Sequence, residues 1–174
     1  NNFAAQSVAH NTILIHQPEE AMPAFWLAWS YKPDGKTYFN HGGQNSVLDA
    51  KTLALQSTRD FIYIAAAATK SYSEVKSREV IRQFVYLKPD CFVIYDRVES
   101  VKPEQQKEIL FHFQNEPEQL GPNLWQADNG GRLFVRTMLP ENPRYSLVGG
   151  PGKEFFASGR NWPVVDPETP DWDK

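Results

Sequence analysis

Two strongly apolar segments joined by a very short connection constrain this fold more than any other feature of the sequence. Val80–Leu87 and Cys91–Val98 are rich in β-branched and aromatic residues, and only Lys88-Pro89-Asp90 separates them. Such segments favour strands, and Pro followed by Asp favours a tight turn. We therefore predict a β-hairpin. Both faces of its first strand carry apolar residues, so we expect a central strand packed on two sides.

Similar segments recur along the whole chain, separated by clusters of Pro, Gly, Asn and Asp, and no helical period is sustained long enough to form a stable helix. The sequence predicts an all-β fold, an antiparallel β-sandwich with an irregular C-terminal tail. The expected strands are Val8–His16, Ala24–Tyr31, Ser46–Ser57, Phe61–Ala67, Ser77–Leu87, Cys91–Val98, Lys107–Gln114, Leu124–Ala127, Arg132–Met138 and Tyr145–Val148.

The chain divides into two parts by composition. Residues 1–148 carry the predicted strands and form the expected β-sandwich domain, including a second hairpin that turns at Asn129-Gly130. Residues 149–174 are rich in Pro and Gly and read as an extended tail. We expect this tail to pack on the sandwich through Phe155, Phe156 and Trp162.

Charge and hydropathy exclude several classes of partner. The net charge is −3 with a pI near 5.8, so the overall field does not favour nucleic acid. The mean hydropathy is −0.53 and no apolar run approaches about 18 residues, so we expect no membrane span. The single cysteine, Cys91, lies in an apolar strand and is expected to be a buried thiol. Because the chain does not open with Met, we expect it to be processed, trimmed or a segment of a longer protein.

The histidines do not form a recognisable metal motif. His10 and His16, if on one strand, are separated by about 20 Å and cannot share a metal unless the strand bends. His41 lies in a Gly-containing loop, where Gly42-Gly43 permit a mobile turn, and His112 lies between two phenylalanines. The sequence has no HxH, HExxH or CxxC pattern, no GxSxG and no phosphate-binding loop. It therefore assigns no catalytic residue and no complete metal site.

Two arginines of the central hairpin have charged neighbours. Arg82 is the polar exception on its face of the strand, and we expect it to pair with Glu79 or Asp96, or to point at a ligand. Asp96 and Arg97 are adjacent, and we expect them to form a buried ion pair that fixes the hairpin.

Other polar and aromatic residues have two readings. One group could face an anionic sugar or form ordinary ion pairs at the surface: Tyr72, Lys76, Arg78 and Arg82. The tryptophans could stack on sugar rings or pack in the core: Trp26, Trp29, Trp125 and Trp162. The sequence leaves the substrate-binding residues unknown.

Several blocks of the sequence, taken in order, resemble the β-sandwich region of the heparinase II/III family of polysaccharide lyases, and heparinase II-like enzymes in particular. These blocks run from about Ala5 to Trp162: SVAHNTILI, ATKSYSEVKSREVIRQFVYLKPDCFVIYDRV, LFHFQNEP, GGRLFVRTMLP and VGGPGKEFF. The most specific of them are AHNT, IRQFVYLKPDCFVIYDRV and VGGPGKEF.

The resemblance implies a function for the full-length protein. Members of the family join an α/α toroid to β-sandwich layers and cleave uronic-acid polysaccharides, such as heparin and heparan sulfate, by β-elimination. Their catalytic residues lie in the toroid and in an HxH motif upstream of AHNT, neither of which this sequence contains. The resemblance thus implies a lyase whose β-sandwich supports the toroid. It also implies an anionic polysaccharide substrate, a periplasmic or secreted location and a possible homodimer. This chain alone is expected to be inactive.

The resemblance also implies a role for His10. In heparinase II-like enzymes a structural zinc is held by a His and an Asp from the upstream segment and by a downstream His, whose place His10 occupies. One imidazole cannot form a zinc site alone. The alternative is that His10 and Asn11 only hydrogen-bond the end of a strand. The alternative function for the whole chain is a non-catalytic carbohydrate-binding or structural β-sandwich module.

Overall fold

The computed structural model describes residues 3–4, 6–21, 40–46, 48–157 and 159–162. The all-β prediction is confirmed, because strands dominate these residues and every paired strand is antiparallel. The only helical elements among them are two 3₁₀ turns, η1 (Ser7–Ala9) and η2 (Thr69–Ser71).

The largest sheet has four strands in the order β2-β3-β4-β5. Their bounds are Lys51–Ser57, Phe61–Ala67, Ser77–Leu87 and Cys91–Ser100. The predicted hairpin is present as β4 and β5, with Leu87 paired to Cys91 at the turn. Strand β4 lies between β3 and β5, so it is central in the sheet as predicted. The expected packing on both of its faces is not seen over most of its length, where its residues are only partly buried.

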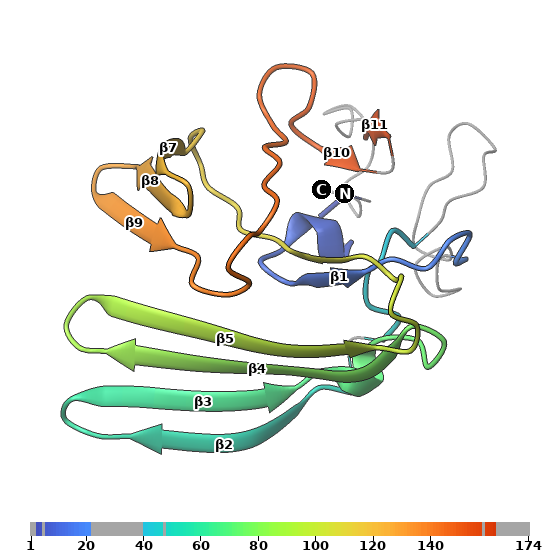
Figure 1. Cartoon of the computed structure of the whole chain (residues 1–174), viewed down its shortest axis with the longest axis horizontal. Helices are drawn as coiled ribbons and strands as arrows, with labels where there is room; N and C mark the ends of the chain where they lie inside the picture. Colours follow the sequence, from blue (N-terminus) through green and yellow to red (C-terminus); the bar gives the residue numbers. More distant parts are fainter. Residues whose placement is uncertain (1–2, 5, 22–39, 47, 158, 163–174) are drawn as a thin grey trace, which may run out of the picture.

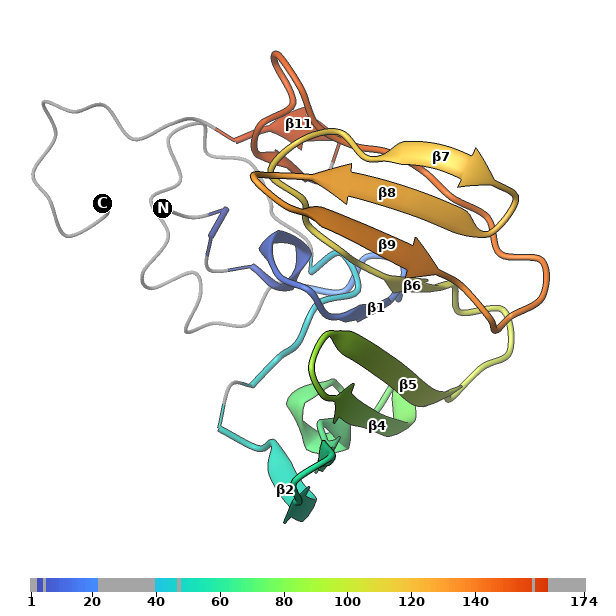
Figure 2. The ribbon, with the colours of Figure 1, turned by 90° about the vertical axis from the view of Figure 1, so that its left-hand side faces the viewer.

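Three smaller sheets complete the fold. They pair β1 (Ile13–Ile15) with β6 (Lys107–Ile109), join β7 (Glu118–Gly121), β8 (Leu124–Asp128) and β9 (Arg132–Arg136), and pair β10 (Phe156–Ala157) with β11 (Arg160–Asn161). The β1–β6 ribbon lies between the four-stranded sheet and the β7–β9 sheet, as two perpendicular views show (Figure 1 and Figure 2).

The main core lies where β1 meets β4. Ile13, Ile15, Tyr72 and Val80 are all 4% exposed or less and form one cluster, against which Val98 packs. Strand β1 supplies two of these side chains because residues 13 and 15 point to the same face. This contact fixes the residues just before β1 relative to the central sheet.

A second cluster ties the C-terminal segment to the N-terminal one. Ala157 and Trp162 are buried, and Phe3, Val8 and Phe155 pack against them. The Phe3 and Phe155 rings meet edge to face with centroids 5.5 Å apart. Ala157 and Trp162 therefore contact Phe3 and the turn that precedes β1.

The four-stranded sheet leaves large apolar side chains exposed. Leu55 is 69% exposed and Phe92 is 53% exposed. Phe92 stacks on Tyr86 with ring centroids 4.6 Å apart, and Ile64 and Ile94 belong to the same face by register. Among the described residues, β1 covers this sheet only near Val80.

The strand predictions need several corrections. Val8–His16 is a strand only at Ile13–Ile15, because residues 7–9 form η1 and residues 10–12 form bends. Ser46–Ser57 becomes regular only at Lys51, and Lys107–Gln114 ends at Ile109. Tyr145–Val148 forms no strand, whereas β7 was not predicted because Glu118–Gly121 lacks β-branched residues. Ala24–Tyr31 lies outside the described residues.

Two predictions about individual side chains are also wrong. Cys91 is exposed, because it opens the edge strand β5 next to the turn. Asp96 and Arg97 do not pair with each other, because successive residues of a strand point to opposite faces. Arg97 instead pairs across the hairpin with Glu79, with 2.6 Å between Nη2 and Oε1.

Candidate functional site

The segment His10-Asn11-Thr12 forms a bend at the entrance to β1. The His10 amide donates to the Ser7 carbonyl at 3.1 Å, which ends η1, and the Thr12 amide donates to the His10 carbonyl at 2.8 Å. The chain then enters the ladder with β6, where the Leu110 amide donates to the Thr12 carbonyl. His10 is therefore not part of a strand shared with His16, and the predicted separation along one strand does not apply.

The His10 imidazole is exposed and oriented. Its Nε2 lies 2.8 Å from the Ala4 carbonyl oxygen. A carbonyl only accepts hydrogen bonds, so Nε2 carries the proton and Nδ1 of the neutral ring keeps its lone pair. No hydrogen bond to Nδ1 is present within the described residues. This arrangement resembles a metal-ligating histidine, whose second nitrogen usually donates to a carbonyl or carboxylate.

Asn11 holds neighbouring elements together. Its Oδ1 accepts from the His112 backbone amide at 2.7 Å and lies 3.0 Å from His112 Nδ1. The other ring nitrogen of His112 lies 3.0 Å from the Val8 carbonyl oxygen. Asn11 thus joins the bend before β1 to the chain that follows β6. This agrees, for Asn11, with the predicted alternative in which the residue only hydrogen-bonds the end of a strand.

Arg82 forms the pair with Asp96 that was one of its predicted alternatives. Its Nε and Nη2 donate to the two carboxylate oxygens at 2.7 and 2.8 Å, and its Nη1 donates to the Asn11 carbonyl at 2.7 Å. The Asp96 side chain is only 3% exposed. The hydrogen bonds that Arg82 donates to Asp96, together with the negative charge of Asp96, raise the pKa of Arg82 above its usual value. Arg82 therefore links the bend at residues 10–12 to the four-stranded sheet.

The residues grouped with Arg82 as a sugar-binding candidate do not share one surface. Tyr72 is buried and donates to the Ile13 carbonyl at 2.6 Å. Arg78 is exposed and pairs with Glu99 at 3.2 Å. Lys76 is completely buried. The structure therefore uses these four residues for packing and ion pairing.

Lys76 is the centre of a buried polar network that the sequence did not reveal. Its Nζ donates to Glu20 Oε2 at 2.6 Å and to the Gly43 carbonyl at 2.5 Å. Desolvation by burial lowers the pKa of Lys76, and the hydrogen bond and charge of Glu20 partly offset this effect. Asn45 donates to the other oxygen of Glu20 at 3.1 Å. The network fastens residues 43–45 onto the segment before β4.

Residues 41–43 run beside β1 and are packed against it. The Ile15 amide donates to the Gly42 carbonyl at 2.9 Å, and a Cβ placed on Gly42 would lie 3.0 Å from the Ile15 nitrogen. Gly42 has φ of +80°, so glycine is required for both its conformation and its close approach. The prediction of a mobile turn at Gly42-Gly43 is wrong, because both residues are buried.

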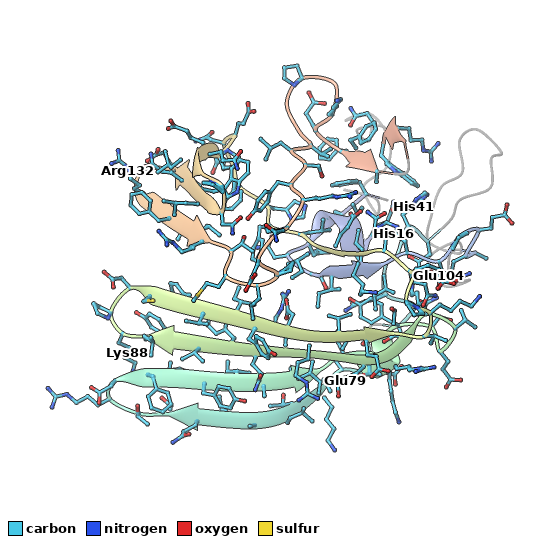
Figure 3. All side chains as sticks on the ribbon, viewed as in Figure 1. His16, His41, Glu79, Lys88, Glu104 and Arg132 are labelled. Atoms are coloured by element: carbon cyan, nitrogen blue, oxygen red, sulfur yellow. The ribbon has the colours of Figure 1, made fainter. Side chains whose placement is uncertain are left out.

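His16 and His41 lie next to each other at the end of β1 (Figure 3). His16 Nε2 is 3.3 Å from Glu108 Oε1. Burial lowers the pKa of His41, and the neighbouring His16 lowers it further. Even so, no group of three or more His, Cys, Asp or Glu side chains suited to a metal ion occurs in the parts of the chain that the structure describes. The described residues alone therefore do not complete a metal site around His10.

The tryptophans have different surroundings. Trp125 packs edge to face on Tyr145, with ring centroids 5.2 Å apart, and Trp162 is buried in the second cluster. Both therefore take the core-packing alternative. Trp26 and Trp29 lie outside the described residues.

A cleft that the sequence did not predict opens beside the β8–β9 hairpin. It has a volume of about 410 Å³ and lies between residues 112–115 and residues 127–133. Its walls include Phe113 and Leu133 and several amide side chains. Only the fold brings these residues together.

Comparison with known proteins gives no relative. No family model, no curated protein and no solved structure matches this chain. Among the described residues, no helix has the length and hydropathy needed to cross a membrane.

Proposed function

We propose that this chain is the C-terminal β-sandwich portion of a heparinase II/III-like lyase that cleaves uronic-acid polysaccharides by β-elimination. In this reaction a base removes the C5 proton of the uronate while a nearby group neutralises its carboxylate, and an acid protonates the leaving glycosidic oxygen. The full-length protein supplies these groups from an α/α toroid and an HxH motif. This chain supports the toroid and contributes one zinc ligand, His10.

The oriented imidazole of His10 is the observation that carries the proposal. Nε2 is held by the Ala4 carbonyl, so Nδ1 is the nitrogen available to a metal. The ring is exposed, and the Asn11 contacts with His112 and Arg82 hold the bend on which it stands. A structural zinc needs three or four ligands, so in this proposal the others come from the preceding segment.

The exposed apolar surface of the four-stranded sheet supports a role inside a larger protein. Leu55, Phe92 and their neighbours form an uncovered apolar area, and such areas on soluble proteins mark contacts with other structure. In the proposed protein, the toroid and the remaining sandwich layers cover this sheet.

The test compares the chain with the full-length protein on a uronic-acid polysaccharide. Elimination produces a conjugated carboxylate that absorbs at about 232 nm. We expect this product from the full-length protein and none from the 174-residue chain. Product from the chain alone, or none from the full-length protein on heparin, heparan sulfate, chondroitin or alginate, would overturn the proposal.

The remaining parts of the proposal concern partners and location. The substrate is an anionic polysaccharide, the upstream toroid is an intramolecular partner, and the protein forms homodimers in the periplasm or outside the cell. Fractionation of the native cells and light scattering of the full-length protein test these points. A carbohydrate-binding module without lyase chemistry would bind the polysaccharide and release no unsaturated product.

A further inference from the structure

We infer that the cleft beside the β8–β9 hairpin binds one uronate residue of a polysaccharide, at a site separate from the zinc-ligand bend. Only the identity of the ligand rests on the proposed function, since a site for an acidic sugar follows from the side chains themselves. At about 410 Å³ the cleft is within the range of small-ligand sites. Arg132 lies at the tip of the hairpin (Figure 3).

Two hydrogen bonds build the cleft. Asn115 Nδ2 donates to the Asp128 carbonyl at 2.7 Å, and Asn129 Nδ2 donates to Gln114 Oε1 at 2.9 Å. They hold the segment after β6 against the hairpin. The neighbouring His112 is anchored in turn by Asn11 and the Val8 carbonyl. The walls are thus set by the fold before any ligand arrives.

These bonds leave amide groups that suit sugar hydroxyls. Each amide side chain has both donor and acceptor capacity, and each of these three uses only part of it. Gln114 retains its Nε2 donors, and Asn115 and Asn129 retain their Oδ1 acceptors, since no described residue bonds to these groups. Adjacent donors and acceptors match neighbouring hydroxyls of a pyranose. Phe113 and Leu133 supply apolar surface for its C–H face.

Arg132 provides the preference for a carboxylate. Its Nε donates to Asp128 Oδ1 at 3.2 Å, which orients the guanidinium. No described residue engages Nη1 or Nη2, so the outer edge presents parallel N–H donors that fit a planar carboxylate. Hydrogen bonds from Gln126 and Arg132 lower the pKa of Asp128, so this orienting carboxylate stays ionised in neutral solution.

The test measures binding to the 174-residue chain by NMR, with a uronic-acid tetrasaccharide and the same tetrasaccharide after reduction of its carboxylates to alcohols. We expect the side-chain amide signals of Gln114, Asn115 and Asn129 to shift with the acidic sugar. Arg132→Gln should weaken binding about fivefold to tenfold. The matched control is Arg136→Gln, which removes an exposed arginine from the same strand outside the cleft and should change affinity less than twofold.

Each other result overturns the inference. Equal binding of the acidic and reduced sugars would remove the carboxylate contact, and equal effects of both arginine variants would show a diffuse charge effect. Shifts confined to other residues would place the ligand elsewhere. The outcome is independent of lyase activity: a full-length protein that releases product without cleft binding refutes only this inference. Cleft binding without product refutes only the proposed function.

Discussion

Replacement of Lys76 by Met tests whether the buried polar network holds residues 43–45 in place. The Lys76 side chain is 0% exposed and its partner Glu20 is 8% exposed, so water screens their interaction very little. The substitution leaves the Glu20 carboxylate buried without its counter-charge. It also removes the shorter of two hydrogen bonds to the Gly43 carbonyl, at 2.5 Å, and leaves the one from Asn40 Nδ2 at 3.0 Å. Loss of one member of such a pair costs about 3–5 kcal/mol.

That cost is a large part of the total stability of a folded domain, about 5–15 kcal/mol. With a urea dependence of about 2 kcal/mol per M, the unfolding midpoint should fall by roughly 1.5–2.5 M. The measurement is urea denaturation followed by tryptophan fluorescence. The matched control, Lys70→Met, makes the same change at an exposed lysine and should shift the midpoint by less than about 0.3 M.

A double variant separates the uncompensated charge from lost packing. Glu20→Gln combined with Lys76→Met removes the buried carboxylate and keeps an acceptor for Asn45, so it should recover at least half of the stability lost by Lys76→Met. A midpoint for Lys76→Met equal to that of Lys70→Met would refute the reasoning, because it would show that the network contributes nothing.

Three further predictions concern the surroundings of the bend. Gly42→Ala should lower the free energy of unfolding by at least about 1 kcal/mol, because the added Cβ meets the Ile15 backbone and φ is positive. The control Gly130→Ala is also at positive φ but has open space around it, so it should lower the free energy of unfolding less in the same urea assay. Since the pKa of His41 is lowered in the folded state, its contribution to stability is complete above the unfolded pKa of about 6.5 and is lost as pH falls below that value. In thermal melts between pH 7 and 5, His41→Asn should therefore reduce the fall of the melting temperature with decreasing pH. An unchanged dependence of the melting temperature on pH would contradict the assignment. Arg82→Gln leaves Asp96 buried and unpaired and should lower the free energy of unfolding by about 3 kcal/mol. Arg97→Gln breaks an exposed pair and should lower it by less than about 1 kcal/mol. Equal losses would show that the Asp96 contact does not anchor the bend.

The strands with clear alternation were predictable from sequence. The β4–β5 hairpin is determined by local residue types and a short turn, and the register then places Arg82 opposite Asp96. The β8–β9 hairpin is likewise signalled by Asn129-Gly130. These features depend on residues close together in the chain.

The features that depend on distant residues were not predictable in this way. Lys76 stands in a polar stretch that reads as surface, and it is buried only because residues 20 and 43 fold over it. The strand character of Thr12–Ile15 does not extend back to His10, because η1 and its contacts with the C-terminal segment redirect the chain. The cleft combines residues 112–115 with 127–133, so no local motif could reveal it.

The most direct test of the proposed function is zinc analysis of the full-length protein by mass spectrometry. It is combined with the assay for unsaturated product, which absorbs at about 232 nm. The account predicts about one zinc per protein and lyase product for the unmodified protein. It predicts loss of most of the zinc in His10→Ala and retention in His16→Ala, because His16 follows the other end of β1 and pairs with Glu108. Full zinc content in His10→Ala, or a protein that contains neither zinc nor lyase activity, would contradict it.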